Sequence, residues 1–333
     1  MKDIEVVSQP LKQLTAKLAD DLRSVDLLIR ERMVSQNVPR IPEVTQYLLD
    51  AGGKKLRPIL TLASANMFDY VGHYHIYLAA TVEFIHTATL LHDDVVDGSL
   101  QRRGRPTPNL LWDNKSSVLV GDFLFARSFQ LMTETNNLRV LELLADTSAT
   151  IAEGEVLQLT AAQSLTLTEE IYLQIVRGKT AALFSAAAEV GGVIANASEL
   201  HLEALRNYGD ALGIAFQIAD DLLDYTDDNP AFGKNIGDDF RDRKMTLPVI
   251  KAVAHATENE KAFWVRTIVN GQQQEGDLDE VLRLLKKYDA IEKTRADAQH
   301  WSYKACASIE CLPECQLRNL LCGLAKYIID RLS

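Results

Sequence analysis

Two groups of aspartates in this chain share a spacing that could serve metal chemistry. Each group reads DDxxD, and the members are Asp93, Asp94 and Asp97, and Asp220, Asp221 and Asp224. On an α-helix, residues four positions apart lie on one face, so the first and last carboxylates of each group would lie together. Carboxylates held so close repel each other unless a cation lies between them. Hard oxygen ligands suit Mg²⁺, which takes one or two carboxylates and fills its shell with water and substrate phosphates.

A single DDxxD has a plainer interpretation, which is a solvated acidic helix end. Two copies are harder to dismiss, because Asp is a poor helix former and both copies follow apolar stretches, such as residues 211–219 before the second. If the two helices face each other across a cavity, their carboxylates predict a binding site with ligands on two opposite sides, which could hold several Mg²⁺ ions and a diphosphate.

Positive charges gather at three places in the chain. They follow a Gly-Gly pair and each aspartate group, at Lys54 and Arg57, at Arg102, Arg103 and Arg105, and at Lys234, Arg241, Arg243 and Lys244. Arg matches phosphate with a planar fork of donors, and Lys acts as a point charge. The alternative is that these cations are surface partners of neighbouring acids, which contribute little. Their position beside paired acidic motifs favours phosphate binding.

Helices must position these side chains. Apolar residues recur at steps of three and four near both ends of the chain, at Leu11, Leu14, Leu18, Leu22 and Val25 and at Leu317, Leu321, Leu324 and Ile328. Alternating strand patterns are scarce. The pattern predicts an all-α fold of about ten or more helices in a single domain, residues 1–333. A helix from about His75 to Asp97, about 34 Å long, would carry the first aspartate group.

The composition limits the function classes. The chain is 47% hydrophobic and 24% charged with a formal net charge of −11, which argues against general binding to nucleic acid or an acidic membrane. No apolar stretch predicts a membrane span, and the first residues do not resemble a secretory signal. The four cysteines, Cys306, Cys311, Cys315 and Cys322, lack zinc-site spacing. We therefore expect reduced structural thiols and a cytoplasmic protein.

Six segments, taken together, resemble the trans-isoprenyl (polyprenyl) diphosphate synthases, in particular the bacterial long-chain members that make octaprenyl to decaprenyl diphosphates. They lie in the family's order within residues 45–250, and they are GGKKLRP (52–58), EFIHTATLLHDDVVD (83–97), SLQRRGRPT (99–107), GKTAALF (178–184), FQIADDLLD (216–224) and GKNIGDDFRDRK (233–244). The last ninety or so residues carry no usable motif.

The resemblance implies a helical bundle of the isoprenoid synthase type with a central cavity. It implies a Mg²⁺-dependent prenyltransferase that condenses isopentenyl diphosphate with an allylic diphosphate, such as farnesyl or geranylgeranyl diphosphate, to make a polyprenyl chain for a quinone. It also implies a dimer, and a homodimer is the form that we expect. The proton would leave to the departing diphosphate, so no protein base is required, and the chain shows no Ser/His/Asp set or Walker loop.

Site residues also follow from the resemblance, position by position. Asp93 and Asp97, with Asp94 in support, would bind Mg²⁺, and Asp220 would hold a third ion with help from Asp224 and, through water, Asp239; Asp221 belongs to the same catalytic group. Isopentenyl diphosphate would be held by Lys54, Arg57, His86 and Arg103. The allylic diphosphate would be held by Arg102, Lys179, Thr180, Gln217, Lys234 and Lys244. His86 lies seven positions, two helical turns, before Asp93.

Product length is expected to depend on the turn before the first aspartate group. Short-chain members of the family block the cavity there with Phe or Tyr, whereas this chain has the small residues Ala88 and Thr89. These residues predict a deep tunnel, although close packing against a neighbouring helix is the alternative.

Three rival functions fit the sequence less well than this one. A terpene cyclase would have a different second metal motif and no isopentenyl diphosphate site, a non-catalytic subunit would tolerate losses in the motifs, and a helical scaffold would not need them. The sequence does not fix the number of isoprene units, the allylic primer or whether the oligomer is homomeric.

Overall fold

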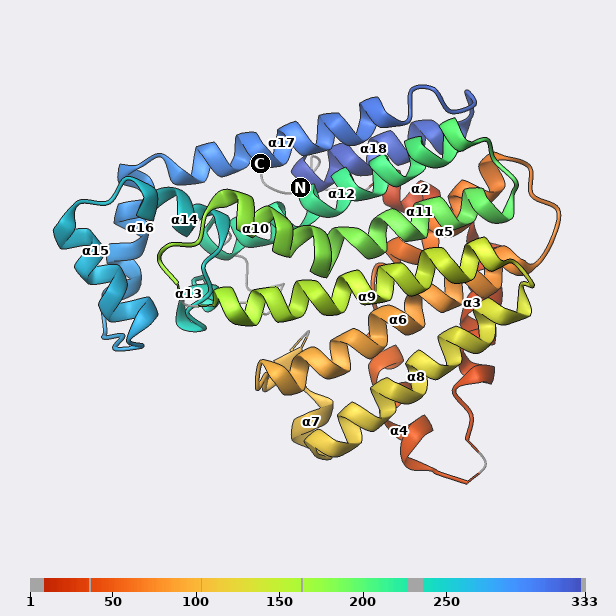
Figure 1. The fold of residues 1–333 in the computed structure, drawn as a ribbon, viewed down its shortest axis with the longest axis horizontal. Coiled ribbons are helices and arrows are strands. Elements are labelled where there is room, and N and C mark those ends of the chain that lie inside the picture. Colours follow the sequence, from red (N-terminus) through yellow and green to blue (C-terminus); the bar gives the residue numbers. More distant parts are fainter. Residues whose placement is uncertain (1–8, 36, 103, 163, 227–235, 331–333) are drawn as a thin grey trace.

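The computed structural model describes residues 9–35, 37–102, 104–162, 164–226 and 236–330. Within these ranges the chain is almost entirely helical (Figure 1), as the sequence predicts. The helices are α2 (Gln9–Lys17), α3 (Ala19–Arg32), α4 (Arg40–Asp50), α5 (Leu56–Met67), α6 (Tyr74–Val96), α7 (Pro108–Leu111), α8 (Asn114–Glu134), α9 (Leu138–Ala161), α10 (Glu169–Val176), η1 (Arg177–Ala181), α11 (Ala182–Ile194), α12 (Glu199–Thr226), α13 (Asp238–Arg241), α14 (Leu247–Ala254), α15 (Glu258–Trp264), η3 (Val265–Val269), α16 (Asp277–Lys287), α17 (Ala290–Ser308) and α18 (Gln316–Asp330).

Helix α6 carries the first aspartate group and is buried along most of its length. Its bounds, Tyr74–Val96, confirm the predicted helix to within one residue at each end. It packs mainly on α8 and α5, with α11 and α3 also in contact. His92, next to the aspartates, lies against α8, where its Nε2 is 3.1 Å from the Val118 carbonyl oxygen. A Cβ at Gly121 would come closer than a normal contact to that ring, so His92 has a packing role.

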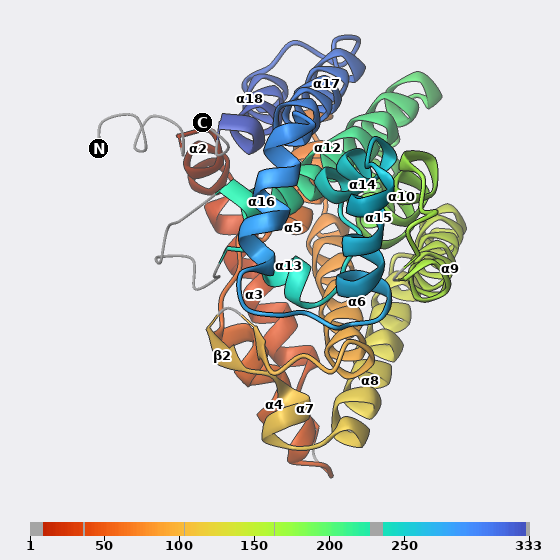
Figure 2. The same cartoon turned by 90° about the vertical axis from the view of Figure 1, so that its left-hand side faces the viewer.

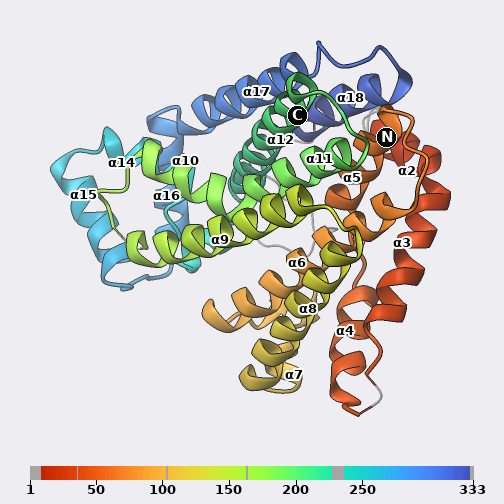
Figure 3. The same cartoon turned by 45° about the vertical axis from the view of Figure 1, so that its right-hand side comes forward.

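Helices α11 and α12 form the centre of the bundle. Almost every residue of α11 is buried, which is typical of a helix surrounded by others. The C-terminal pair α17 and α18 covers α12 from one side (Figure 3). The buried apolar side chains of all these elements form one continuous cluster.

The only strands among the described residues form a short hairpin that follows the first aspartate group. Strand β1 (Gln101–Arg102) pairs antiparallel with β2 (Arg105–Pro106). Gly104 has a positive φ of 72°, which glycine adopts without the steric cost of a Cβ. Figure 2 shows the hairpin beside α4 and α7, at the end of the molecule opposite α17 and α18.

The prediction for the cysteines was wrong in part. Cys306 of α17 and Cys322 of α18 form a disulfide with their Cα atoms 4.8 Å apart, whereas Cys311 and Cys315 are free thiols, as expected. Sequence spacing did not reveal the pairing, because it depends on how the two helices lie against each other. Among the described helices, none combines the length and apolar character that a membrane span requires.

A π-helical turn, η1, lies against α9 through two glycines. A Cβ on Gly178 would be 2.8 Å from the Gly154 Cα, and a Cβ on Gly154 would be 2.7 Å from the Lys179 backbone nitrogen. Real Cβ atoms do not approach backbone atoms so closely, so only glycine allows the two backbones to touch. π-Helical turns occur often at functional sites.

We predict that Gly178→Ala forces η1 and α9 apart. Overpacking of this kind lowers the free energy of unfolding by about 1–3 kcal/mol, measurable by denaturant titration. The matched control is Gly323→Ala in α18, where the new Cβ would meet only the Pro10 side chain, at 3.2 Å. Equal stability of the Gly178 variant and the wild type would mean that the glycine contact does not set the spacing of η1 and α9.

Candidate active site

The first aspartate group lies at the C-terminal end of α6, where the helix dipole disfavours negative charge. Asp94 is buried, and its Oδ1 accepts two hydrogen bonds from Arg102, at 3.0 Å from Nε and 2.8 Å from Nη2. Its Oδ2 is buried and has no hydrogen-bond partner. Asp97 is the exposed C-cap of the helix. The group therefore carries negative charge in a place where only nearby cations can compensate it.

Asp93 is the least compensated member of this group. Burial, together with the nearby Glu155 and Asp97, raises its pKa to about 7, although Lys179 acts in the opposite direction. Burial also raises the pKa of Asp94, against the effect of Arg102. At neutral pH Asp93 is thus only partly ionised, and a bound cation would favour its charged form.

The second aspartate group lies near the C-terminal end of α12 and is held by hydrogen bonds. Asp221 is buried; its Oδ2 accepts from the Tyr172 hydroxyl at 2.6 Å and its Oδ1 from Gln217 Nε2 at 2.8 Å. Burial and the neighbouring Asp239 raise its pKa to about 7. Asp224 Oδ2 accepts from the backbone N–H of Asp239 at 3.1 Å. Asp220 is half-buried.

Two consecutive residues of η1 connect the two groups. Lys179 Nζ lies 2.9 Å from Glu155 Oε2 and 3.8 Å from Asp93 Oδ2. Thr180 Oγ1 donates to Gln217 Oε1 at 3.0 Å, and Gln217 in turn contacts Asp221. The structure therefore brings together Asp93, Lys179, Thr180, Gln217 and Asp221, which are spread over more than a hundred positions of the sequence.

Lys244, a basic residue that follows the second aspartate group, is also close to carboxylates. Lys244 Nζ lies 3.2 Å from both Asp239 Oδ1 and Asp242 Oδ2. Burial alone would lower the pKa of Lys244, but the two carboxylates outweigh it and raise the pKa. Of the other predicted phosphate ligands, Arg103 and Lys234 lie outside the described residues.

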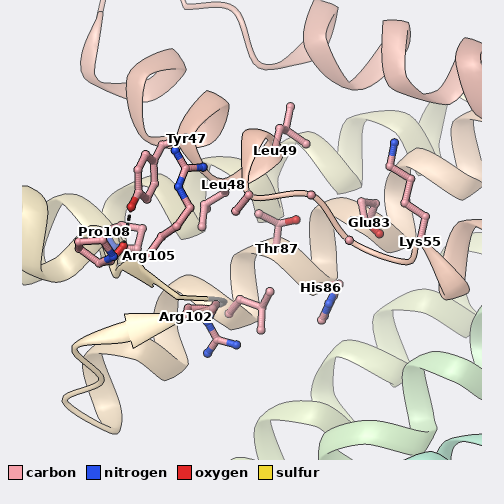
Figure 4. Close-up of a pocket in the computed structure, with 15 residues that line it drawn as sticks. Tyr47, Leu48, Leu49, Lys55, Glu83, His86, Thr87, Arg102, Arg105 and Pro108 are labelled. Carbon is pink, nitrogen blue, oxygen red and sulfur yellow. Dashed lines mark hydrogen bonds between the residues drawn. The ribbon is translucent and has the colours of Figure 1, made fainter. Parts of the chain in front are cut away.

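A separate pocket opens between α4, α6 and the hairpin, with about 660 Å³ of space that includes some open to solvent. Figure 4 shows Tyr47, Arg105 and Pro108 together at one end and Lys55 and Glu83 toward the other, with Arg102 and His86 beside the cavity. The predicted ligand His86 thus lines a cavity that is also lined by cationic side chains. Lys55, which the sequence interpretation left out, lines it as well and pairs with Asp26. Lys54, which it included, is exposed.

Arg57 is half-buried, and desolvation of its guanidinium lowers its pKa to about 10, although Glu83 acts in the opposite direction. Its guanidinium carbon lies 4.4 Å from the centre of the Phe184 ring. Its Nε is buried without a hydrogen-bond partner. A cation in this environment is stabilised by an anion, which is the condition that a diphosphate would supply.

The two residues expected at the chain-length wall lie in the middle of α6. Ala88 is fully buried. Thr89 is half-buried, and its hydroxyl donates to the His86 carbonyl oxygen at 2.8 Å. Neither observation distinguishes a tunnel from close packing, so the assignment remains a prediction.

Sequence reasoning missed Glu155 and Tyr172, which contact predicted site residues. Each belongs to a helix without a recognised motif, and the partner lies 24 positions away for Glu155 and 49 for Tyr172. The one signal for Glu155 was the preceding Gly154, since a glycine inside a helical stretch often has a packing or functional reason.

The donor chemistry of the site fits Mg²⁺ bound together with a substrate. Among the described residues, no three His, Cys, Asp or Glu side chains converge closely enough to form a metal cage. Mg²⁺ seldom uses such a cage and instead takes one or two carboxylates with water and phosphate oxygens. The buried, unpartnered Asp94 Oδ2 is consistent with that mode of binding.

Known proteins resemble this chain over nearly its whole length. The model of the polyprenyl synthetase family matches residues 38–285. Octaprenyl diphosphate synthase of Escherichia coli is 41% identical over 96% of this chain and 99% of that protein. A decaprenyl diphosphate synthase structure from Rhodobacter capsulatus is 62% identical, with a TM-score of 0.94 over 97% of this chain and 99% of that one. A polyprenyl synthase from Caulobacter crescentus, complexed with calcium and isoprenyl diphosphate, is 46% identical, with a TM-score of 0.92 over 97% and 98% of the two chains.

The raised pKa of Asp93 predicts how stability depends on pH when no metal is present. The pKa in the folded state, about 7, exceeds that of an unfolded Asp, about 3.9. The stabilising contribution is therefore complete below pH 4 and is lost as the pH rises through 7. Relative to Asp93→Asn, the wild type in EDTA should lose about 2 kcal/mol of unfolding free energy between pH 5 and 8.

Denaturant titrations of both proteins at each pH measure this difference. Asp122→Asn serves as the control, because Asp122 is largely exposed, with a side-chain exposure of 64%. A difference between wild type and Asp93→Asn that stays constant over this pH range would contradict the assigned environment of Asp93.

Proposed function

Because the chain belongs to the polyprenyl synthetase family, we propose that its two aspartate groups and the cations around them bind the substrates of chain elongation. The protein is a prenyltransferase that makes long-chain all-trans polyprenyl diphosphates of the octaprenyl to decaprenyl class. The observation that carries the site assignment is the link between both aspartate groups through Lys179 and Thr180.

We assign the metal ligands within this framework. Asp93 and Asp97 would bind Mg²⁺ from one side and Asp220 and Asp224 from the other, with three ions in total. Bound Mg²⁺ supplies charge stabilisation for the diphosphate that leaves the allylic substrate. Asp221, whose two oxygens already accept hydrogen bonds from Tyr172 and Gln217, would orient the second group. Asp94, bound by Arg102, would do the same for the first.

The allylic diphosphate would lie against η1 and α12. Lys179, Thr180, Gln217, Arg102 and Lys244 would hold it, and Lys234, outside the described residues, completes the proposed set. Lys179 already lies between Asp93 and Glu155, so it can neutralise a phosphate oxygen next to the carboxylates. Charge-assisted hydrogen bonds of this kind are about twice as strong as neutral ones.

Isopentenyl diphosphate would occupy the pocket beside α6. His86 lines this pocket, and Arg57 is a half-buried cation whose buried Nε has no hydrogen-bond partner. Lys54 and Arg103 complete the proposed set. The chain's own residues thus bind both diphosphates, orient the two substrates and exclude water from the allylic cation, while the released diphosphate accepts the proton.

The rival functions lose their basis under this assignment. Membership in a family of synthases, with 41% identity to an octaprenyl diphosphate synthase over 96% of the chain, separates this protein from terpene cyclases and helical scaffolds. A non-catalytic subunit would have no reason to retain Lys179 between Asp93 and Glu155 or the hydrogen bonds that fix Asp221.

We also infer three broader properties. Residues 1–333 would form one synthase domain, and the protein would act in the cytoplasm as a homodimer. Exposed apolar side chains on α7 and α8, Leu110, Leu111, Leu119 and Phe129, support association with a second copy. The polyprenyl product would become the side chain of a quinone, starting from a farnesyl or geranylgeranyl primer.

Removal of metal tests the reaction directly. We expect that farnesyl diphosphate and isopentenyl diphosphate give long-chain products with Mg²⁺, none with EDTA, and products again when Mg²⁺ is restored. Asp93→Ala and Asp220→Ala should lower turnover at least a hundredfold with an unchanged helical circular-dichroism spectrum, since each removes a carboxylate from the metal site. The exposed Asp279→Ala is the control. Full turnover in EDTA would disprove the proposed role of the aspartates.

The product-length assignment predicts shortened chains for Ala88→Phe and Thr89→Tyr. A ring that fills an open tunnel costs little stability, whereas overpacking costs about 1–3 kcal/mol. We therefore expect a near-normal melting temperature and products of about farnesyl to geranylgeranyl length by chromatography. The control is Ala80→Phe, at a fully buried position earlier in α6. A lowered melting temperature with unchanged products would favour close packing at positions 88 and 89.

A further inference from the structure

The hairpin β1–β2 carries Arg102 to the site, but two strands of two residues each are too short to hold a position by themselves. The base of the hairpin is fixed by Thr107, whose hydroxyl donates to the Ser99 carbonyl oxygen at 2.6 Å. Strand β1 is fixed to α6 by the two hydrogen bonds from Arg102 to Asp94. These contacts do not fix strand β2, which needs contacts of its own with a neighbouring element.

Tyr47 of α4 supplies it with three contacts. Its hydroxyl donates to the Pro106 carbonyl oxygen at 2.8 Å (Figure 4). The Arg105 guanidinium carbon lies 4.7 Å from the centre of its ring, within cation–π range. The ring of Trp112, at the end of α7, meets it edge to face with centroids 5.6 Å apart. Strand β2 and the end of the helix that follows the hairpin thus converge on one side chain.

These contacts form one wall of the pocket that we assign to isopentenyl diphosphate. Tyr47, Arg105 and Pro106 line the same cavity as His86, Lys55 and Arg102. Arg105 is exposed, and only the Tyr47 ring gives its guanidinium a defined place among the contacts of the described residues. Movement of β2 would therefore widen this pocket, whereas Arg102 would keep its bonds to Asp94.

We propose that Tyr47 and Arg105 are positioning residues that latch the hairpin over the isopentenyl diphosphate pocket and so set the affinity for that substrate. Neither residue needs to touch the reacting atoms. The inference rests on the proposed function, because it uses the assignment of this pocket to isopentenyl diphosphate.

The test compares Tyr47→Phe, Tyr47→Ala and Arg105→Ala in the full-length protein. Loss of the hydroxyl alone should raise KM for isopentenyl diphosphate about threefold, and Tyr47→Ala about tenfold, in line with the usual worth of these contacts. KM for farnesyl diphosphate should change less than twofold. Because Arg105 acts through the ring, Tyr47→Ala combined with Arg105→Ala should be no worse than Tyr47→Ala alone.

Hydrogen exchange provides a readout that does not depend on activity. The amides of residues 98–102, 104, 105 and 107 should exchange faster in Tyr47→Ala than in the wild type, because the hairpin opens more often. Tyr288 is a matched control: Lys287 Nζ lies 4.8 Å from its ring centre and its hydroxyl donates to Glu260 at 2.6 Å. Tyr288→Phe and Tyr288→Ala should leave both the hairpin exchange and the ratio of the two KM values unchanged.

The outcomes separate the latch from the proposed function. If wild-type protein makes no polyprenyl product with Mg²⁺, the proposed function fails. If it does, but Tyr47→Ala leaves hairpin exchange unchanged or raises both KM values equally, the latch is overturned. A double variant much worse than Tyr47→Ala would also overturn it, since Arg105 would then act on the ligand directly.

Discussion

The rest of the structure depends on one constraint, which is that carboxylates from both aspartate groups are wholly or partly buried inside an apolar helical bundle. Desolvation is the largest cause that raises the pKa of both Asp93 and Asp221 to about 7. Burial of each side chain therefore costs free energy, and this cost increases when the carboxyl group ionises. Like charges and a helix C-terminus add to that cost at the first group. The polar residues around the two groups reduce this cost through hydrogen bonds and ion pairs with the carboxylates. The same arrangement suits a site that becomes complete only when cations and phosphate bind.

The backbone makes this arrangement possible before any side chain does. Contact between Gly154 and Gly178 lets η1 lie directly on α9, which places Lys179 beside Glu155 and Asp93. The next residue, Thr180, faces α12 and reaches Asp221 through Gln217. A larger residue at either glycine would separate the first aspartate group from the lysine that compensates it. Packing and electrostatics are therefore coupled at one π-helical turn.

The sequence predicted what depends on local pattern and missed what depends on contacts across the fold. The all-α fold class followed from apolar periodicity near both ends of the chain, and the helix predicted over residues 75–97 agrees with α6 to within one residue at each end. The roles of Lys179 and Gln217 came from a family resemblance, and the structure places both beside aspartates. Tyr172, the Tyr47–Arg105 contact and the Cys306–Cys322 pair carry no local signature, and Glu155 has only the preceding Gly154, because each contact depends on two helices or loops that meet only after folding.

Helix α6 contains both His86, in the pocket beside the hairpin, and Asp93, in the first aspartate group. Seven helical residues separate them by about 10 Å along the axis, and the packing of α6 on both sides prevents that spacing from changing. One rigid helix would hold two substrates bound at these positions at a fixed distance from each other. Their encounter would then have the kinetics of a reaction within a single molecule, with an effective molarity far above any concentration of the free substrates. A bent or interrupted α6 would lose this advantage even with every ligand residue intact.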